Sequence, residues 1–182
     1  MDKTVAIRLL AEINQQSVSV LVNSVETKLK EGVKIFRILL SSPGGTVFHG
    51  IAAYNFLKGV PAKIITHNFG TVDSIAAVIY CSGTERLSVP NARFLIHGIG
   101  WNPPPGIRFE EKQLKEQLKS LEIDRENIAK IIAGHCKKEV AEVEKLMFDG
   151  TTFNPIQAKE FGLVHEITEV LIPQGTEIIG IG

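Results

Sequence analysis

Residues 70–83 read GTVDSIAAVIYCSG, and this stretch shows how the chain is built. A strand-like segment, AKIITH at residues 62–67, precedes it, and an apolar run begins at Ile75. The apolar run predicts a buried helix that follows a strand directly. Asp73 and Ser74 therefore stand where a strand passes into a helix. A serine at such a place either caps the helix or is held there to do chemistry.

The rest of the chain alternates strands and helices in the same way. We expect strands at residues 5–13, 33–40, 62–67, 86–89, 93–96 and 163–167, and helices at residues 17–29, 46–58, 75–80, 109–133, 137–147 and 156–161. The segment SSPGG at residues 41–45 must turn, because Pro-Gly-Gly breaks both regular structures. The alternation predicts an α/β domain with a mainly parallel sheet, and EIIGIG at residues 177–182 is expected to add an edge strand or to line an interface.

Composition excludes several classes of protein. The 182 residues are 44% hydrophobic and 22% charged, with 20 basic and 20 acidic side chains, so nothing indicates nucleic-acid binding. No apolar run reaches the roughly 18 residues of a membrane span, and the first residues do not resemble a signal peptide. Cys81 and Cys136 show neither metal spacing nor a disulfide framework, and the histidines form no metal-binding pair. We expect a cytoplasmic protein without membrane association, metal or other cofactor.

A long charged segment at residues 109–133 has apolar side chains at helical spacing. These side chains are Leu114, Leu118, Leu121, Ile128, Ile131 and Ile132. From the pattern alone, a helix packed on the surface is favoured over a projecting arm that meets a copy of itself. The preceding stretch, WNPPPG at residues 101–106, is expected to be extended and stiff, because its prolines cannot donate ladder hydrogen bonds.

Three polar side chains could together carry out nucleophilic catalysis. A serine nucleophile needs a base, an acid that orients the base, and donors for the oxyanion. Ser74 opens the buried helix, His97 ends the strand ARFLIH, and Asp149 lies in FDGTTF between two helices. Each has an ordinary structural explanation, as a helix cap, a hydrogen-bonded surface histidine and a turn aspartate, so only their combination indicates a site.

Four segments give the chain a specific resemblance. FRILLSSPGG, GTVDSIAAVIYCSG, RLSVPNARFLIH and FDGTTFNPIQAKEFGLVHEI, which together fall between residues 36 and 167, are similar to motifs of the Clp protease proteolytic subunit (ClpP) family. That family consists of serine peptidases of the crotonase-like fold. The last segment also places an aspartate six residues before Pro155, as the family does.

The resemblance implies a fold and a division of the chain. It implies an α/β fold of the crotonase/ClpP type, a repeated β-β-α superhelix with a long helix projecting as a handle. We accordingly expect a single peptidase domain over residues 1–182, with a head at about 1–100 and 148–182 and a handle at about 101–147.

The resemblance also implies a mechanism and partners. Ser74 would be the nucleophile, His97 the general base and Asp149 the orienting acid, while the amides of Gly45 and Ile75 would form the oxyanion hole. The implied activity is an ATP-dependent Clp-type serine endopeptidase that cleaves peptides or unfolded proteins inside a homo-oligomeric ring, a heptamer or a double ring. The implied partner is a Clp ATPase.

Three departures from the family pattern leave an inactive or regulatory ring subunit as the alternative. Asp73 stands where the family has a small residue, and we expect it to cap the helix. Pro103, Pro104 and Pro105 interrupt the segment that lines the substrate groove in the family. Val5 is almost at the chain start, where the family has a segment that helps to dock the ATPase, so the sequence itself does not predict that partner.

Two other crotonase-fold classes fit less well. Acyl-CoA hydratases and hydrolases usually place carboxylates at the site rather than a Ser-His-Asp set. A membrane-anchored signal-peptide peptidase uses a serine-lysine pair, and no lysine near SPGG or Ser74 outranks His97.

Overall fold

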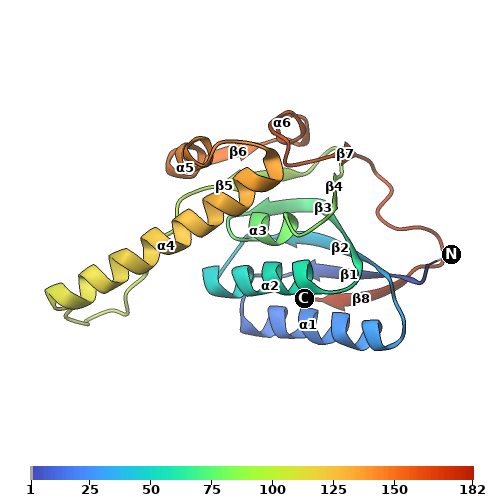
Figure 1. The fold of residues 1–182 in the computed structure, drawn as a ribbon, viewed down its shortest axis with the longest axis horizontal. Helices are drawn as coiled ribbons and strands as arrows, with labels where there is room; N and C mark the ends of the chain where they lie inside the picture. Colours follow the sequence, from blue (N-terminus) through green and yellow to red (C-terminus); the bar gives the residue numbers. More distant parts are fainter. Residues whose placement is uncertain (1) are drawn as a thin grey trace.

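The computed structural model describes residues 2–182 and contains one mainly parallel sheet with helices against it (Figure 1). In chain order the elements are β1 (Thr4–Leu10), α1 (Gln15–Lys30), β2 (Ile35–Ser42), α2 (Val47–Gly59), β3 (Lys63–Asp73), α3 (Ala76–Tyr80), β4 (Glu85–Ser88), β5 (Arg93–Ile96), α4 (Glu111–Cys136), α5 (Val140–Asp149), β6 (Thr151–Phe153), α6 (Pro155–Phe161), β7 (Glu166–Ile167) and β8 (Glu177–Ile181). The predicted α/β class with a mainly parallel sheet is confirmed.

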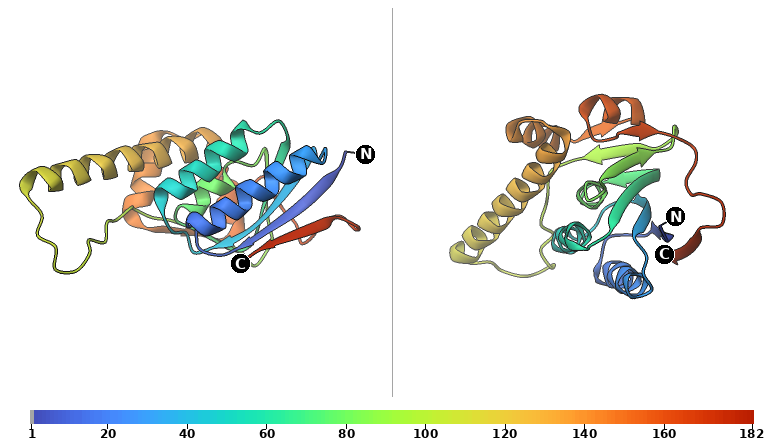
Figure 2. Two further views of the ribbon diagram at one scale, coloured as in Figure 1. Left: turned by 90° about the horizontal axis from the view of Figure 1, so that it is seen from below. Right: turned by 45° about the vertical axis from the view of Figure 1, so that its right-hand side comes forward.

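The sheet has the strand order β6-β5-β3-β2-β1-β8, and all these pairs are parallel except β5 with β6. Helices α1, α2 and α3 lie along one face of it (Figure 2, right). The core between these layers includes Phe36, Ile38 and Leu40 of β2, which are fully buried. These are alternate residues of the strand, so their side chains lie on the same face of the sheet. The C-terminal segment adds β8 at the edge, beside β1, as expected for EIIGIG.

Strand β3 is the element on which the site depends, because two strands share one of its edges. Its first half, residues 65–68, pairs with β4, and its last residues, 71–73, pair with β5. The two halves of β3 thus act as two strands and are followed by helix α3. The next part of the chain repeats this arrangement with two separate strands, β4 and β5, followed by helix α4. This is the repeated β-β-α pattern expected of the fold.

The long helix α4 projects from the body, as Figure 1 and the left view of Figure 2 show. Its buried residues all belong to its C-terminal part, from Ile128 to Cys136, whereas Leu114 and Leu118 are exposed. The packed surface helix that the pattern alone favoured is therefore wrong for the first half of α4. That half keeps a chain of i,i+4 ion pairs instead of a core contact, for example Lys112 with Glu116 at 3.8 Å.

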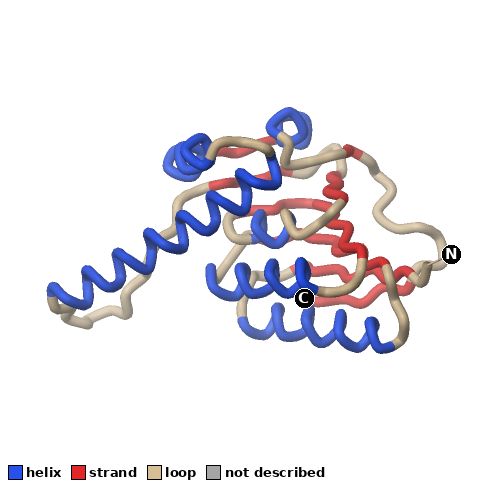
Figure 3. The backbone as a smooth tube through the Cα atoms, in the orientation of Figure 1, coloured by secondary structure: helices blue, strands red, loops and turns tan. Residues whose placement is uncertain are grey.

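Helix and strand ends differ from the expectations in two places that matter. Strand β3 continues six residues beyond His67, and the short strand β6 was not expected at all. Between β5 and α4, residues 97–110 form no strand, in line with the three consecutive prolines there (Figure 3).

Candidate active site

Ser74 occupies a sharp turn between β3 and α3. Its φ is +57°, which a non-glycine residue adopts only where the surroundings impose it. Its N–H donates to the carbonyl of Leu95 on β5 at 2.7 Å. On the other side it lies against Gly44, where a Cβ atom would come within 2.6 Å of the Ser74 Cβ. The serine is therefore held between β5 and the glycine turn, with its side chain half-buried.

Two backbone amides beside Ser74 are free to act as donors. Within residues 2–182, neither the Gly45 N–H nor the Ile75 N–H donates a hydrogen bond to another atom of the chain. Gly45 has a φ of +149°, and a Cβ there would lie 2.2 Å from the carbonyl oxygen of Ile13, so only glycine fits. The turn is anchored on both sides, since Ile13 N–H donates to Gly44 at 2.8 Å and Thr46 N–H donates to Ile13 at 2.8 Å.

His97 follows β5 directly, two residues after the carbonyl that accepts the Ser74 N–H. Along β5 the side chains of Phe94 and Ile96 are buried, whereas Arg93 and His97 are exposed, so His97 continues the outer face of the strand. Within residues 2–182 its imidazole makes no hydrogen bond.

Asp149 is the last residue of α5, just before β6. Strand β6 pairs antiparallel with β5, and the last rung joins Ile96 with Thr151. The final turn of α5 also approaches the chain after His97, because a Cβ on Gly98 would lie 3.6 Å from the Met147 carbonyl oxygen. The pairing therefore brings the Asp149 backbone to the end of β5 at which His97 lies.

The sheet places the three predicted residues at one edge. The carboxyl ends of the parallel strands β3 and β5 meet the amino end of β6, so Ser74, His97 and Asp149 leave three adjacent strands at the same place. Within residues 2–182, no hydrogen bond joins their side chains to one another. The Asp149 carboxylate is ion-paired with Lys145, one helical turn back, at 2.5 Å.

The expectation that Asp73 caps the helix is wrong. Helix α3 has Ile75 at its N-cap and no side-chain cap, while Asp73 is the last residue of β3. Its carboxylate accepts from the Thr71 hydroxyl at 2.7 Å and from the Arg93 guanidinium at 2.7 Å. Asp73 binds Arg93 because the pairing of β3 with β5 puts Arg93 opposite Thr71. The local sequence around Asp73 does not reveal this pairing.

The Clp protease family model matches residues 1–170. The chain belongs to the Clp protease family. The ATP-dependent Clp protease proteolytic subunit of Bdellovibrio bacteriovorus is 28% identical over 138 residues, which cover 75% of this chain and 65% of that protein. The ATP-dependent Clp protease proteolytic subunit 2 of Corynebacterium efficiens is 31% identical over 134 residues, or 72% of this chain and 65% of that protein. The chain thus spans slightly less than two thirds of the length of these relatives.

A solved structure of a ClpP1 mutant from Listeria monocytogenes has the same fold. It superposes with a TM-score of 0.81 and 23% identity, and the superposition covers 91% of both chains. This likeness confirms the expected ClpP-like fold with its long helix. The family match ends at residue 170, so β8 lies outside it.

In this Clp family protein, both cysteines and two further histidines have structural surroundings that make them less reactive. Burial raises the pKa of the Cys81 thiol and raises that of Cys136 to about 11, so neither is a ready nucleophile. Burial lowers the pKa of His67 and of His135 to about 4. The Nε2 of His67 lies 3.2 Å from the Thr168 carbonyl, and that of His135 lies 2.9 Å from the Tyr54 hydroxyl.

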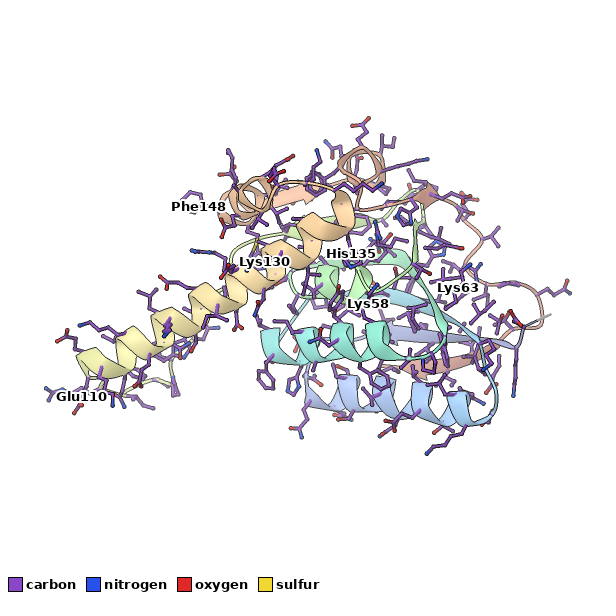
Figure 4. All side chains as sticks on the ribbon, in the orientation of Figure 1. Lys58, Lys63, Glu110, Lys130, His135 and Phe148 are labelled. Carbon is purple, nitrogen blue, oxygen red and sulfur yellow. The ribbon has the colours of Figure 1, made fainter. Side chains whose placement is uncertain are left out.

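A cavity of about 520 Å³ opens next to the candidate site, between the projecting helix and α5. Apolar side chains line most of it, and an ion pair of Arg125 with Glu144 at 3.4 Å crosses its wall. Gly98, directly after His97, contributes to the wall, as does Phe148, which is 90% exposed and lies on the outer side of α5 (Figure 4).

Neither a metal centre nor a membrane span emerges from the described part of the chain. No group of three or more potential ligands gathers among residues 2–182. Across the same residues, every helix is too short or too polar to traverse a bilayer.

Sequence reasoning missed three residues that shape the site. Gly44, the first glycine of SPGG, contacts Ser74, although only the second glycine was assigned a role. Arg93 binds Asp73, and Lys145 binds Asp149. Lys145 and Asp149 have the four-residue spacing of a helical ion pair, but the predicted helix ends at residue 147, whereas α5 extends to Asp149. The other two depend on which strands pair.

Proposed function

We propose that this Clp family chain is a serine endopeptidase that cleaves peptides or unfolded proteins. Ser74 is the nucleophile, His97 the general base and Asp149 the acid that orients the imidazole. The amides of Gly45 and Ile75 form the oxyanion hole.

The chemistry follows from these roles. His97 takes the Ser74 proton as the hydroxyl oxygen attacks the scissile carbonyl, and the two amides bind the tetrahedral oxyanion. His97 then gives the proton to the leaving amine, which departs and leaves an acyl-enzyme. A water molecule, activated by the same imidazole, hydrolyses the acyl-enzyme and regenerates Ser74.

The single observation that supports this proposal most is the sheet edge. Ser74, with its left-handed φ of +57°, stands beside two amides that have no partner within residues 2–182, and the pairing of β3, β5 and β6 places His97 and Asp149 at the same edge. The free Ile75 amide is usual for the start of a helix, but a simple helix cap requires neither the free Gly45 amide nor the strained backbone at Ser74.

The cavity beside His97 supports a peptide substrate with an apolar side chain. Residues such as Ile99, Leu121 and Met147 line it, and its wall includes Gly98, which directly follows His97. We further infer that the protein works as a homo-oligomeric ring, a heptamer or double ring, because the family resemblance implies one. The names of the relatives describe them as ATP-dependent. Peptidase assays with and without a Clp ATPase and ATP test whether this chain shares that dependence.

A fluorophosphonate probe tests the proposal, since it labels only an activated serine. The assembled full-length protein is expected to gain one adduct, which peptide mapping places on Ser74. Ser74→Ala should lose the adduct, and Ser19→Ala, which changes an exposed serine on α1, should keep it. An assembled wild-type protein that neither reacts with the probe nor cleaves unfolded casein contradicts the proposal and favours the inactive ring subunit.

A further inference from the structure

An unusual charged group lies directly beside the candidate nucleophile. The Asp73 carboxylate accepts one hydrogen bond from Thr71 Oγ1 at 2.7 Å and one from Arg93 Nη2 at 2.7 Å. Arg93 Nε donates to the same Thr71 hydroxyl at 3.1 Å, which closes the three side chains into a ring. The Asp73 side chain is only 7% exposed, whereas that of Arg93 is 58% exposed.

This group ties together the two strands that lead to Ser74 and His97. Strands β3 and β5 share only three rungs, and the last joins Asp73 with Leu95. Ser74 N–H then donates to the Leu95 carbonyl. Asp73 directly precedes Ser74, and Arg93 lies four residues before His97 on the same outer face of β5.

The charge of Asp73 needs this partner. A carboxylate with so little solvent around it costs much free energy when no cation neutralises it. It would also oppose the negative charge that develops on the substrate oxygen beside Ile75, two residues away in the chain. A small residue at this position would have neither effect, so the aspartate is tolerable only because β5 supplies Arg93.

We propose that Arg93 is a positioning residue of the peptidase, which neutralises Asp73 and holds it away from the oxyanion hole. This inference rests on the proposed function of Ser74. It predicts that the loss of Arg93 slows acylation of Ser74, and that removal of the Asp73 charge restores the rate.

The experiment compares acylation by the fluorophosphonate probe in four assembled full-length proteins. Arg93→Met should lower the maximal rate constant of labelling by roughly tenfold to a hundredfold, with little change in half-saturating probe concentration. Asp73→Asn should react within a few-fold of wild type. The double variant D73N/R93M should return close to the rate of D73N.

A matched control uses the other end of the same strand. Lys63 (labelled in Figure 4) is the first residue of β3 and forms an ion pair with Glu85 on the neighbouring β4, whereas Ser74 follows the other end of β3. Lys63→Met should leave the labelling rate unchanged. Arg93→Lys, which keeps the positive charge, should label faster than R93M. Circular dichroism and thermal unfolding of every variant show which proteins are folded at the assay temperature.

The outcomes separate the two proposals. If wild type is not labelled at Ser74, the proposed function fails and this inference fails with it. If wild type is labelled but R93M reacts at the same rate, or D73N/R93M is as slow as R93M, only the role of Arg93 is overturned. If R93M does not fold whereas D73N/R93M folds and reacts like D73N, neutralisation of Asp73 by Arg93 is supported.

Discussion

The two ends of the candidate triad are built in different ways. Ser74 is held by the interior of the molecule, through the Leu95 carbonyl, the contact with Gly44 and the charged group at Asp73. Asp149 lies at the end of an exposed helix, with 46% of its side chain exposed and an ion pair to Lys145. Packing and hydrogen bonds thus fix the backbone at Ser74, whereas the Asp149 side chain is half exposed and ion-paired with Lys145.

This contrast says which parts of the site are rigid. If Ser74 is the nucleophile, strand pairing and a glycine turn set its position, and such fixed positioning of a reacting group favours catalysis. An orienting acid held by one exposed ion pair is exchangeable, because such pairs contribute little free energy. We infer that the rate of the first chemical step depends on how often Asp149 leaves Lys145.

The largest effect is expected at Asp149. If it orients His97, Asp149→Asn should lower the peptidase kcat by about 10⁴-fold, because the amide stabilises the wrong form of the imidazole. Glu142→Gln is the matched control, since Glu142 of α5 also forms an i,i+4 ion pair, with Lys138 just before the helix, at 3.2 Å. Equal activity of D149N and wild type would remove Asp149 from the triad.

The nucleophile end is most sensitive at Gly44. In Gly44→Ala the new Cβ would lie 2.6 Å from Ser74 Cβ and 2.9 Å from the Asp73 carbonyl oxygen, so the serine must move. Displacement of a reacting group by about 1 Å costs on the order of a hundredfold in rate, and probe labelling should fall accordingly.

Gly134→Ala provides the comparison for that change. Gly134 lies inside α4, and apart from the helix's own backbone no described atom lies within 4 Å of the Cβ that alanine would add. The protein should keep its labelling rate and gain roughly 0.5–1 kcal/mol of helix stability. Unchanged labelling in G44A would mean that the glycine turn does not position Ser74.

Acid should destabilise the sheet that leads to Ser74. The pKa of His67 on β3 is lowered to about 4, mainly by burial and to a smaller degree by the nearby Arg37, while the Thr168 carbonyl opposes the shift. Below the unfolded pKa of about 6.5 the unfolded chain binds a proton that the folded chain does not. The free energy of unfolding should therefore fall between pH 6.5 and pH 4, by about 3 kcal/mol for this group.

Urea denaturation at pH 7 and pH 4.5 measures that difference. His67→Leu should show a smaller loss of stability than wild type over this range. It should not abolish the loss, because His135, whose pKa burial also lowers to about 4, remains. An equal loss in both proteins would show that His67 takes up its proton as easily folded as unfolded.

Most of the sheet could be predicted from sequence, because its buried strands are continuous apolar runs. VKIFRILL and AKIITH both became strands, and the buried helix after Ser74 began within one residue of its expected start. The resemblance added the β-β-α repeat and the projecting helix, which apolar spacing alone described wrongly. Charged i,i+4 pairs lie along the part of that helix that has no core to pack on, and each contributes a small stabilisation.

The missed parts depend on pairing between distant segments. The end of β3, NFGTVD, is polar and glycine-containing, and TTF at β6 is too short to signal a strand, yet both are paired through β5. The partner of Asp73 followed from the same pairing. Resemblance to family motifs predicted Ser74, His97 and Asp149 as a catalytic triad. That assignment stays a prediction, which labelling of Ser74 tests.

The smallest expected effect concerns Lys145. Lys145→Met removes the cation that holds the Asp149 carboxylate at 2.5 Å, so the carboxylate should turn to His97 more often. Since exposed ion pairs contribute roughly 0.2–1 kcal/mol, acylation should speed up by no more than about fivefold. Lys145→Arg, which keeps the ion pair, should react like wild type, and high salt should raise the wild-type rate toward that of K145M. A slower K145M would mean instead that Lys145 helps to place Asp149, and that the acid end of the site is as fixed as the nucleophile end.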